Sequence, residues 1–165
     1  TEERSAQVCA ELFSDVLQGA PLVTNQSLWR RFPLLWCERW VNGNMALVGD
    51  AAHTAHYSVG SGTRLAMEDA IALVKAAVEH GDLADGLDAY QQRRPPIARK
   101  IVDAARTSAK WYENYPGRMA LAPYPFALDY IMRSGRIDMA RLQQLSPLFV
   151  ASYEAATGRH PDDPG

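Results

Sequence analysis

Apolar residues recur three and four positions apart along most of the chain, which is the spacing of one face of an α-helix. The pattern predicts helices at residues 4–18, 63–80, 82–92, 97–112, 126–133 and 138–145. Gly81 is suited to end the second helix, and Pro95-Pro96 is expected to interrupt the helical run that follows. The second helix is expected to bury an apolar stripe in the core, formed by Met67, Ile71, Val74 and Val78.

The segment between residues 27 and 48 has a different pattern, in which apolar residues alternate or run together. Residues 27–40 predict a strand, because large apolar side chains alternate onto one face. Asn42-Gly43 then predicts a tight hairpin turn, and the apolar run 45–48 predicts a strand covered on both faces. Short strands within 28–48, followed by helices, indicate an α+β chain that is mostly helical.

The composition is that of an ordinary globular chain with a core, at 165 residues, 47% hydrophobic and 22% charged. A formal charge of −2 gives no reason to expect binding to nucleic acid or to an anionic membrane. Every apolar run is shorter than the roughly 20 residues that a membrane span needs. Cys9 and Cys37 suit neither a disulfide scaffold nor a zinc site, so we expect two free thiols and a cytoplasmic location.

The stretch from Leu47 to His53, followed by Gly60-Ser61-Gly62 and a helix, carries the candidate chemistry. It places the Asp50 carboxylate after a strand, where ligands bind in open α/β sheets. An ionised Asp accepts hydrogen bonds only, which suits the hydroxyls of a sugar or polyol. The glycines allow a flat ligand to approach the backbone, and the helix that follows presents N–H groups and a positive dipole end. Such an end stabilises negative charge on an electron-rich ring.

The segment 48–53, with Gly60 and Gly62 opening the helix, resembles the second flavin motif of the p-hydroxybenzoate-hydroxylase-like FAD-dependent aromatic monooxygenases. Residues 90–95 also resemble the Tyr and Arg-Arg-Pro segment of that family. The resemblance implies that Asp50 holds the ribityl chain of FAD and that the start of the helix meets the pyrimidine edge of the isoalloxazine. The cofactor-binding residues that it implies are Gly49, Asp50, Gly60, Gly62, Thr63 and Arg64.

Residues 37–40, 53–58 and 133–136 are similar to the family's branch that acts on aryl-CoA thioesters, the salicylyl-CoA 5-hydroxylases and 2-aminobenzoyl-CoA monooxygenases. The resemblance implies hydroxylation of an aromatic substrate by O₂ through a flavin C4a-hydroperoxide, with NADH or NADPH as reductant. A free aromatic acid or an indole compound is the alternative substrate, since a violacein-pathway hydroxylase has a similar loop. His56 and Tyr57 stand where most of the family has a proline pair, and they are the candidates for catalytic residues and for lining the pocket.

The family's first flavin motif, G-x-G-x-x-G between a strand and a helix, does not occur in these 165 residues. We therefore expect the C-terminal fragment of a FAD-binding α/β monooxygenase fold, whose partner is the N-terminal dinucleotide-binding unit of the same protein. Alone, the fragment is expected to be inactive, to bind FAD poorly and to self-associate, for example as a homodimer. The expected parts are the end of the substrate-binding region (1–44), the flavin motif and its helix (45–81), a C-terminal helical region (82–157) and a flexible tail (158–165).

Several patterns also have simpler interpretations. Asp50, His53 and His56 form D-x-x-H-x-x-H, but they lie in a loop without a fourth ligand nearby, so we expect no metal and a structural role for His53. A helix face with four cations is expected to be solvated, the alternative being contacts to CoA phosphates; it contains Arg93, Arg94, Arg99 and Lys100.

Other functions remain as alternatives to the monooxygenase. A non-catalytic helical interaction module is one, and a flavin-dependent halogenase or dehydrogenase is another. The halogenase is disfavoured because the chain lacks a Trp-x-Trp-x-x-Pro motif. Three indoles are expected to pack against a sheet face: Trp29, Trp36 and Trp40.

Overall fold

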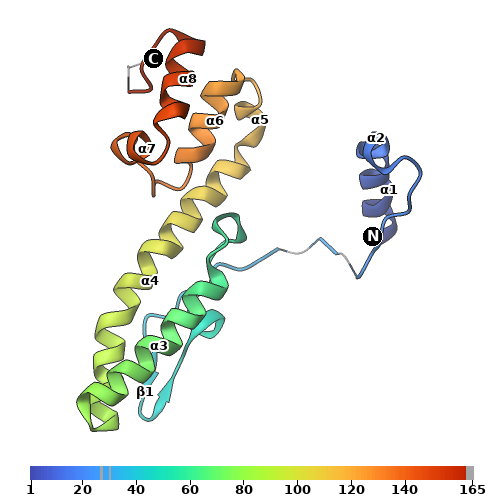
Figure 1. The fold of residues 1–165 in the computed structure, drawn as a ribbon. Coiled ribbons are helices and arrows are strands. Elements are labelled where there is room, and N and C mark those ends of the chain that lie inside the picture. The colour runs from blue at the N-terminus through green and yellow to red at the C-terminus, as the bar shows by residue number, and fades with distance from the viewer. Residues whose placement is uncertain (27, 30, 163–165) are drawn as a thin grey trace. The chain divides into compact units, whose positions relative to one another are not determined.

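The computed structural model describes residues 1–26, 28–29 and 31–162, and the chain is mostly helical with one small antiparallel sheet (Figure 1). This arrangement agrees with the expected α+β class. The elements in chain order are α1 (Glu2–Leu12), α2 (Ser14–Leu17), β1 (Val41–Asn42), β2 (Met45–Ala46), the 3₁₀ helices η1 (Gly49–Ala51) and η2 (Tyr57–Val59), α3 (Gly62–His80), α4 (Leu83–Glu113), α5 (Tyr115–Arg118), α6 (Pro123–Met132), α7 (Met139–Leu145) and α8 (Pro147–Thr157).

The chain forms two compact units, residues 1–33 and 34–165. In the first unit, α1 begins at Thr1, whose side chain accepts a hydrogen bond from the Arg4 N–H, and the helical path changes at Phe13 before α2. No residue of α1 or α2 is buried. Trp29 is 88% exposed, and its indole N–H donates to the Ser5 hydroxyl at 2.7 Å, so this indole does not pack against a sheet. The functional roles expected for the four parts of the chain remain predictions.

The centre of the second unit is the antiparallel pair α3 and α4, which lie side by side (Figure 1). Gly81, with φ +67°, ends α3 as predicted, and the Asp82 side chain caps α4 by accepting from the N–H groups of Ala84 and Asp85. The helices approach closely at Gly86, where an added Cβ would lie 2.7 Å from the Ala77 Cα. The buried core of this unit contains Trp40, Ala52, Leu65, Ala76, Ala89, Tyr90, Ala98 and Val102.

Helix α4 continues without interruption through Pro95 and Pro96, so the predicted break between two helices is wrong. A proline inside a helix costs about 3 kcal/mol or more, because it removes a hydrogen bond and crowds the preceding turn. Here Pro95 is buried, and its neighbour Arg94 is bonded to α3. Packing against α3 therefore outweighs the local preference of the proline pair.

The predicted strand over residues 27–40 is also wrong for the described part of that segment, and residues 27 and 30 lie outside it. The described sheet consists of β1 and β2, with Val41 opposite Ala46. Its turn is Gly43-Asn44, one residue later than predicted, and Gly43 has a φ of +60°. Nor is the run 45–48 covered on both faces, since Met45 is 64% exposed. The N–H and C=O groups of a long strand need a neighbouring strand as their hydrogen-bond partner. Among the described residues before β1, only the isolated bridge between Trp36 and His53 provides such pairing.

The C-terminal helices surround Trp111, whose indole N–H donates to Asp129 at 2.6 Å. Arg118 binds the other oxygen of that carboxylate at 3.0 Å. The predicted helices at 126–133 and 138–145 are confirmed as α6 and α7, and α8 is an additional helix that the sequence pattern did not predict. The aromatic rings packed around Trp111 are Tyr112, Tyr115, Phe126 and Tyr130.

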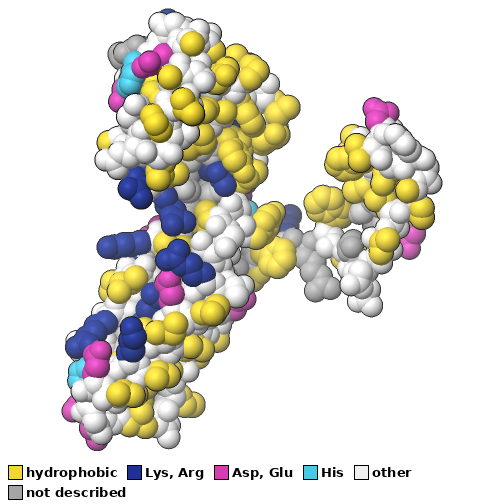
Figure 2. Space-filling view, in the orientation of Figure 1, with side chains coloured by type: hydrophobic (Ala, Val, Ile, Leu, Met, Phe, Trp, Pro, Cys, Tyr) yellow, Lys and Arg dark blue, Asp and Glu magenta, His cyan; other side chains and the backbone are white. Residues whose placement is uncertain are grey.

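The apolar stripe predicted to be the buried face of α3 instead faces outward. Leu65, Asp69 and Ala76 are the buried residues of α3. Hydrophobic side chains are visible on the surface over α3 in Figure 2. None of the described helices is both long and apolar enough to cross a membrane. We call the four outward-facing residues the exposed α3 stripe: Met67 (62% exposed), Ile71 (53%), Val74 (62%) and Val78 (77%).

Candidate functional site

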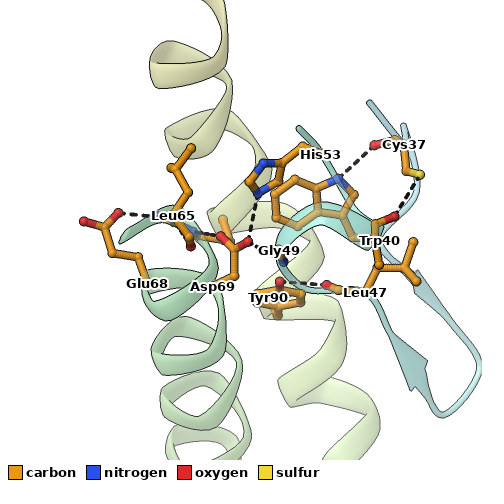
Figure 3. A network of polar contacts seen from close by, with 11 residues as sticks. Cys37, Trp40, Leu47, Gly49, His53, Leu65, Glu68, Asp69 and Tyr90 are labelled. Carbon is orange, nitrogen blue, oxygen red and sulfur yellow. Dashed lines mark hydrogen bonds and ion pairs between the residues drawn. The ribbon is translucent and has the colours of Figure 1, made fainter. Parts of the chain in front are cut away.

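A buried carboxylate on α3, that of Asp69, holds the turn that follows β2. One oxygen of Asp69, Oδ2, accepts a hydrogen bond from the Gly49 N–H at 2.9 Å and lies 2.8 Å from His53 Nε2 (Figure 3). The other oxygen, Oδ1, accepts from Arg94 Nε at 2.7 Å. Asp69 itself has no exposed surface. One carboxylate thus joins the turn, a histidine and helix α4.

Two opposing effects act on the pKa of Asp69. Burial raises the pKa of this carboxyl, whereas the hydrogen bonds from His53, Arg94 and the Gly49 N–H lower it by a larger amount. The net result is a pKa below the ordinary value, so Asp69 is ionised at neutral pH. The buried charge is therefore matched by a cation and by two further donors, as a buried ionic group requires.

His53 is 2% exposed and stacks on Trp40, with ring centroids 5.0 Å apart and planes 28° from parallel. The structural role expected for this histidine is confirmed, because its Nε2 is used by Asp69. His56 is bonded elsewhere, to Ser58, so the D-x-x-H-x-x-H pattern does not gather its two histidines at one point. Within the described residues there is no group of three or more His, Cys, Asp or Glu side chains placed to hold a metal ion.

Arg94 is 5% exposed, so the solvated position predicted for it is wrong. Besides Asp69, its guanidinium donates to the Leu65 carbonyl at 3.3 Å and to Glu68 at 3.1 Å. Glu68 also accepts from Arg64 at 2.7 Å, and this hydrogen bond is the main cause that lowers the pKa of Glu68. Arg94 is therefore a structural cation that joins α4 to α3.

Side chains of helix α4 also form hydrogen bonds with the backbone that precedes the turn. The Gln91 side-chain oxygen accepts from the backbone N–H groups of Trp40 and Val41, at 2.6 Å and 3.0 Å. The Tyr90 hydroxyl donates to the Leu47 carbonyl at 2.9 Å, and burial raises the pKa of this phenol well above its ordinary value. Tyr90 and Arg94, four residues apart on one helix face, therefore hold the two sides of the same turn.

Within this fixed turn, the Asp50 side chain is exposed to solvent. Gly49 is buried with a φ of +59°, and an added Cβ would lie 3.0 Å from the Ala66 Cβ, so a glycine is required there. Asp50 follows in η1 and is exposed. None of the described residues forms a hydrogen bond or an ion pair with its carboxylate. The protein thus fixes the backbone of Asp50 and leaves both carboxylate oxygens available.

The loop between Asp50 and α3 carries His56 and Tyr57, whose rings stack with centroids 4.2 Å apart. His56 Nδ1 accepts from the Ser58 N–H at 3.2 Å, and it lies 2.9 Å from the Ser58 hydroxyl. Tyr57 is 75% exposed. Gly60 then adopts a φ of +60°, which reverses the chain toward α3. The aromatic pair therefore stands on a short, internally bonded turn.

The N-terminus of α3 has no side-chain cap. The hydroxyl of Ser61, at the N-cap position, donates to the Val59 carbonyl at 3.2 Å and forms no bond to the first turn of the helix. Backbone N–H groups of Gly62, Thr63 and Arg64 are thus left at the positive end of a 19-residue helix. Gly49 contacts this helix at Ala66, so η1 adjoins its first turns.

The structure thus gathers the predicted residues 49, 50, 60 and 62–64 around η1 and the start of α3. The sequence pattern did not identify Asp69, whose carboxylate accepts from the Gly49 N–H and so fixes the turn before Asp50. Asp69 lies four residues after Leu65 and seven before Ala76, on the helix face that the structure shows to be buried, and the sequence spacing alone did not distinguish that face.

The chain belongs to the FAD binding domain family, which it matches over residues 10–105. It is 36% identical to the salicyloyl-CoA 5-hydroxylase of Streptomyces sp, over 98% of this chain and 33% of that protein. It is 48% identical to the 3-hydroxy-4-methyl-anthranilyl-[aryl-carrier protein] 5-monooxygenase of Streptosporangium sibiricum, over 66% of this chain and 31% of that protein. It is also 33% identical to the protodeoxyviolaceinate monooxygenase of Chromobacterium violaceum, over 81% of this chain and 36% of that protein. The expected resemblance to FAD-dependent aromatic monooxygenases is confirmed, and the chain spans about a third of the length of these relatives.

Proposed function

We propose that this chain is the C-terminal part of an FAD- and NAD(P)H-dependent monooxygenase that hydroxylates an aromatic ring. The observation that carries the proposal is the exposed, unpartnered Asp50 carboxylate on a backbone that Asp69 holds in place. The family match over residues 10–105 includes this turn and all of α3.

The residues present fit the cofactor. Asp50 offers two acceptor oxygens for the ribityl hydroxyls of FAD, and the uncapped N–H groups of residues 62–64 offer donors for the pyrimidine edge of the ring. When bound, FAD would supply the oxidation–reduction chemistry by which NAD(P)H and O₂ hydroxylate the substrate. The protein's own contribution is to orient the ring system and to place a positive helix end where negative charge gathers. His56 and Tyr57 are proposed to line the substrate side of the loop.

The proposed substrate is an aromatic acid joined through a thioester. Two relatives are named for aromatic groups carried on CoA or on an aryl-carrier protein, which supports this class. A CoA ester brings phosphates that require cationic contacts. Of the cations considered for that role, Arg94 is used by Asp69, and Arg93 pairs with Glu79 at 3.0 Å. Arg99 pairs with Asp103 at 3.4 Å and lies over the Trp36 ring. Lys100, which is exposed, is therefore the better candidate.

We further propose that a dinucleotide-binding unit, N-terminal to this chain in the same protein, completes the cofactor site. The chain lacks the G-x-G-x-x-G motif that binds pyrophosphate, and its relatives are about three times longer. The exposed α3 stripe is an apolar surface suited to packing against such a unit.

Replacement of Asp50 tests the cofactor site. In the full-length protein, Asp50→Asn should weaken FAD binding by about 10- to 100-fold, since it removes a charge-assisted acceptor. Asp88→Asn, at an exposed position of α4, is the matched control and should keep the flavin. Flavin retained by Asp50→Asn at full stoichiometry through gel filtration would contradict the proposal.

The thioester requires a separate test, in which NADH oxidation is coupled to detection of the hydroxylated product. Turnover of salicylyl-CoA or 2-aminobenzoyl-CoA should exceed turnover of the free acids and should fall with added salt, because phosphate contacts are screened. Equal or faster turnover of a free acid would reject the thioester and leave the flavin site intact. The same holds for an indole substrate, the alternative suggested by the protodeoxyviolaceinate monooxygenase.

A further inference from the structure

We infer that Arg133, at the end of α6, is a positioning residue for the loop that leads from Asp50 into α3. Its guanidinium NH2 donates to the Ser58 carbonyl at 3.1 Å, across 75 positions of sequence. Its NH1 donates to the Tyr130 carbonyl at 2.8 Å, within the last turn of its own helix. One side chain therefore ties the C-terminal helices to the candidate site.

The guanidinium is held in place by aromatic rings as well as by hydrogen bonds. Its central carbon lies 4.0 Å from the centroid of the Tyr130 ring and 5.9 Å from that of Tyr112. The Tyr112 hydroxyl in turn donates to the Tyr130 hydroxyl at 3.4 Å. Arginine can stack its planar cation on an aromatic ring and donate to two carbonyls at the same time, which lysine cannot do. Lysine would therefore restore the contact only in part.

Arg133 binds a carbonyl that the loop's own hydrogen bonds leave unused. In the turn η2, the Ser58 N–H is bonded to His56, and the Gly60 N–H donates to the Tyr57 carbonyl at 3.0 Å. Arg133 donates to the Ser58 carbonyl instead. Removing this donor releases the turn that carries the His56–Tyr57 pair and that precedes Gly60.

This inference rests on the proposed function, because the positioned loop matters only if it borders the flavin and the substrate. Arg133 would then act through the loop, without touching the ring system. We expect Arg133→Gln in the full-length protein to weaken FAD binding by about tenfold, the worth of one charge-assisted hydrogen bond.

The test is backbone hydrogen exchange, read on peptides covering residues 55–62 in the 165-residue chain. Arg133→Gln should raise exchange there by about tenfold, and Arg133→Lys should give an intermediate rate. Arg136→Gln is the control, since Arg136 is exposed and has no partner among the described residues. Unchanged exchange in 55–62, or a uniform rise throughout the chain, would overturn the inference.

The pairing with Asp50→Asn separates the two proposals. If Asp50→Asn loses flavin while Arg133→Gln changes neither exchange nor flavin affinity, the positioning role fails and the cofactor site stands. If Arg133→Gln frees the loop while Asp50→Asn keeps the flavin, the contact is real and the cofactor assignment fails.

Discussion

At the scale of single residues, the main feature is the buried, charged carboxylate of Asp69. Asp69 accepts from Gly49, His53 and Arg94, so the carboxylate fixes a backbone turn and a cation at once. The residue that faces outward, Asp50, depends for its placement on one that is buried. Asp69 therefore stabilises the fold and also fixes the backbone next to Asp50.

Replacing Asp69 should destabilise the chain strongly. Asp69→Asn leaves the buried Arg94 cation without its counter-charge, and breaking a buried pair in this way costs about 3–5 kcal/mol. The free energy of unfolding, from urea titration of the 165-residue chain, measures the effect. Asp103→Asn is the control, because its pair with Arg99 at 3.4 Å is exposed and worth about 0–1 kcal/mol. A loss no larger than that of the control would show that Asp69 does not hold the turn.

The Asp69→Asn variant should also differ from the original chain in how its free energy of unfolding depends on pH. The pKa of Asp69 is lowered in the folded state, so its contribution to stability is complete above the ordinary value of 3.8 and is lost as the pH falls through the folded pKa. The difference in unfolding free energy between the original chain and Asp69→Asn should accordingly be constant near neutral pH and shrink below pH 3.8. A difference that stays constant in that acidic range would show that the pKa of Asp69 is not lowered in the folded state.

The sequence predicts which candidate residues lie together where they are close along the chain, and their roles in binding remain predictions. The glycines, Asp50 and the start of α3 belong to one short segment, and their order along the chain determines their order in space. The Asp69–Arg94 pair depends on the contact of two helices across 25 positions, which spacing alone does not reveal. Arg94 was consequently predicted to be solvated.

At the scale of elements, the contact of α3 with α4 determines the geometry of the site. Gly86→Ala should be destabilising by about 1–3 kcal/mol, because the new Cβ would overlap the backbone of Ala77. Gly117→Ala is the matched control, since nothing lies within 4 Å of an added Cβ there, and it should be neutral or slightly stabilising. Thermal melting of the two variants distinguishes the cases, and equal melting points would contradict the close approach.

Helices were predicted well and strands poorly, for a physical reason. A helix satisfies its hydrogen bonds within itself, whereas a strand needs a neighbour, and the described chain offers only a two-residue partner for β1. The buried face of α3 was mistaken because the helix has apolar residues on two faces. Periodicity does not say which face meets α4, and small residues such as Ala76 occupy the buried face.

At the scale of the whole molecule, the exposed α3 stripe should make the isolated chain self-associate. Changing Val74 and Val78 together to glutamate should weaken that association by about tenfold or more, since it places charge on an apolar contact. Leu148→Glu, at a position 81% exposed on α8, is the control. Sedimentation over a range of concentrations measures the effect. An original chain that stays monomeric throughout, or an equal effect of the control, would reject the role of the stripe.

The distribution of indole rings makes the chain its own optical probe. Trp29 belongs to the first unit and is 88% exposed, whereas Trp40 is 1% exposed against His53 and Trp111 is 6% exposed among the C-terminal helices. Emission from the exposed ring should lie at longer wavelength than emission from the two buried rings. Variants that keep one of these indoles and replace the other three, Trp36 included, with phenylalanine would report each region separately by intrinsic fluorescence. Flavin bound near Asp50 would then quench the Trp40 fluorescence through energy transfer. The same measurement would therefore report both unfolding and cofactor binding.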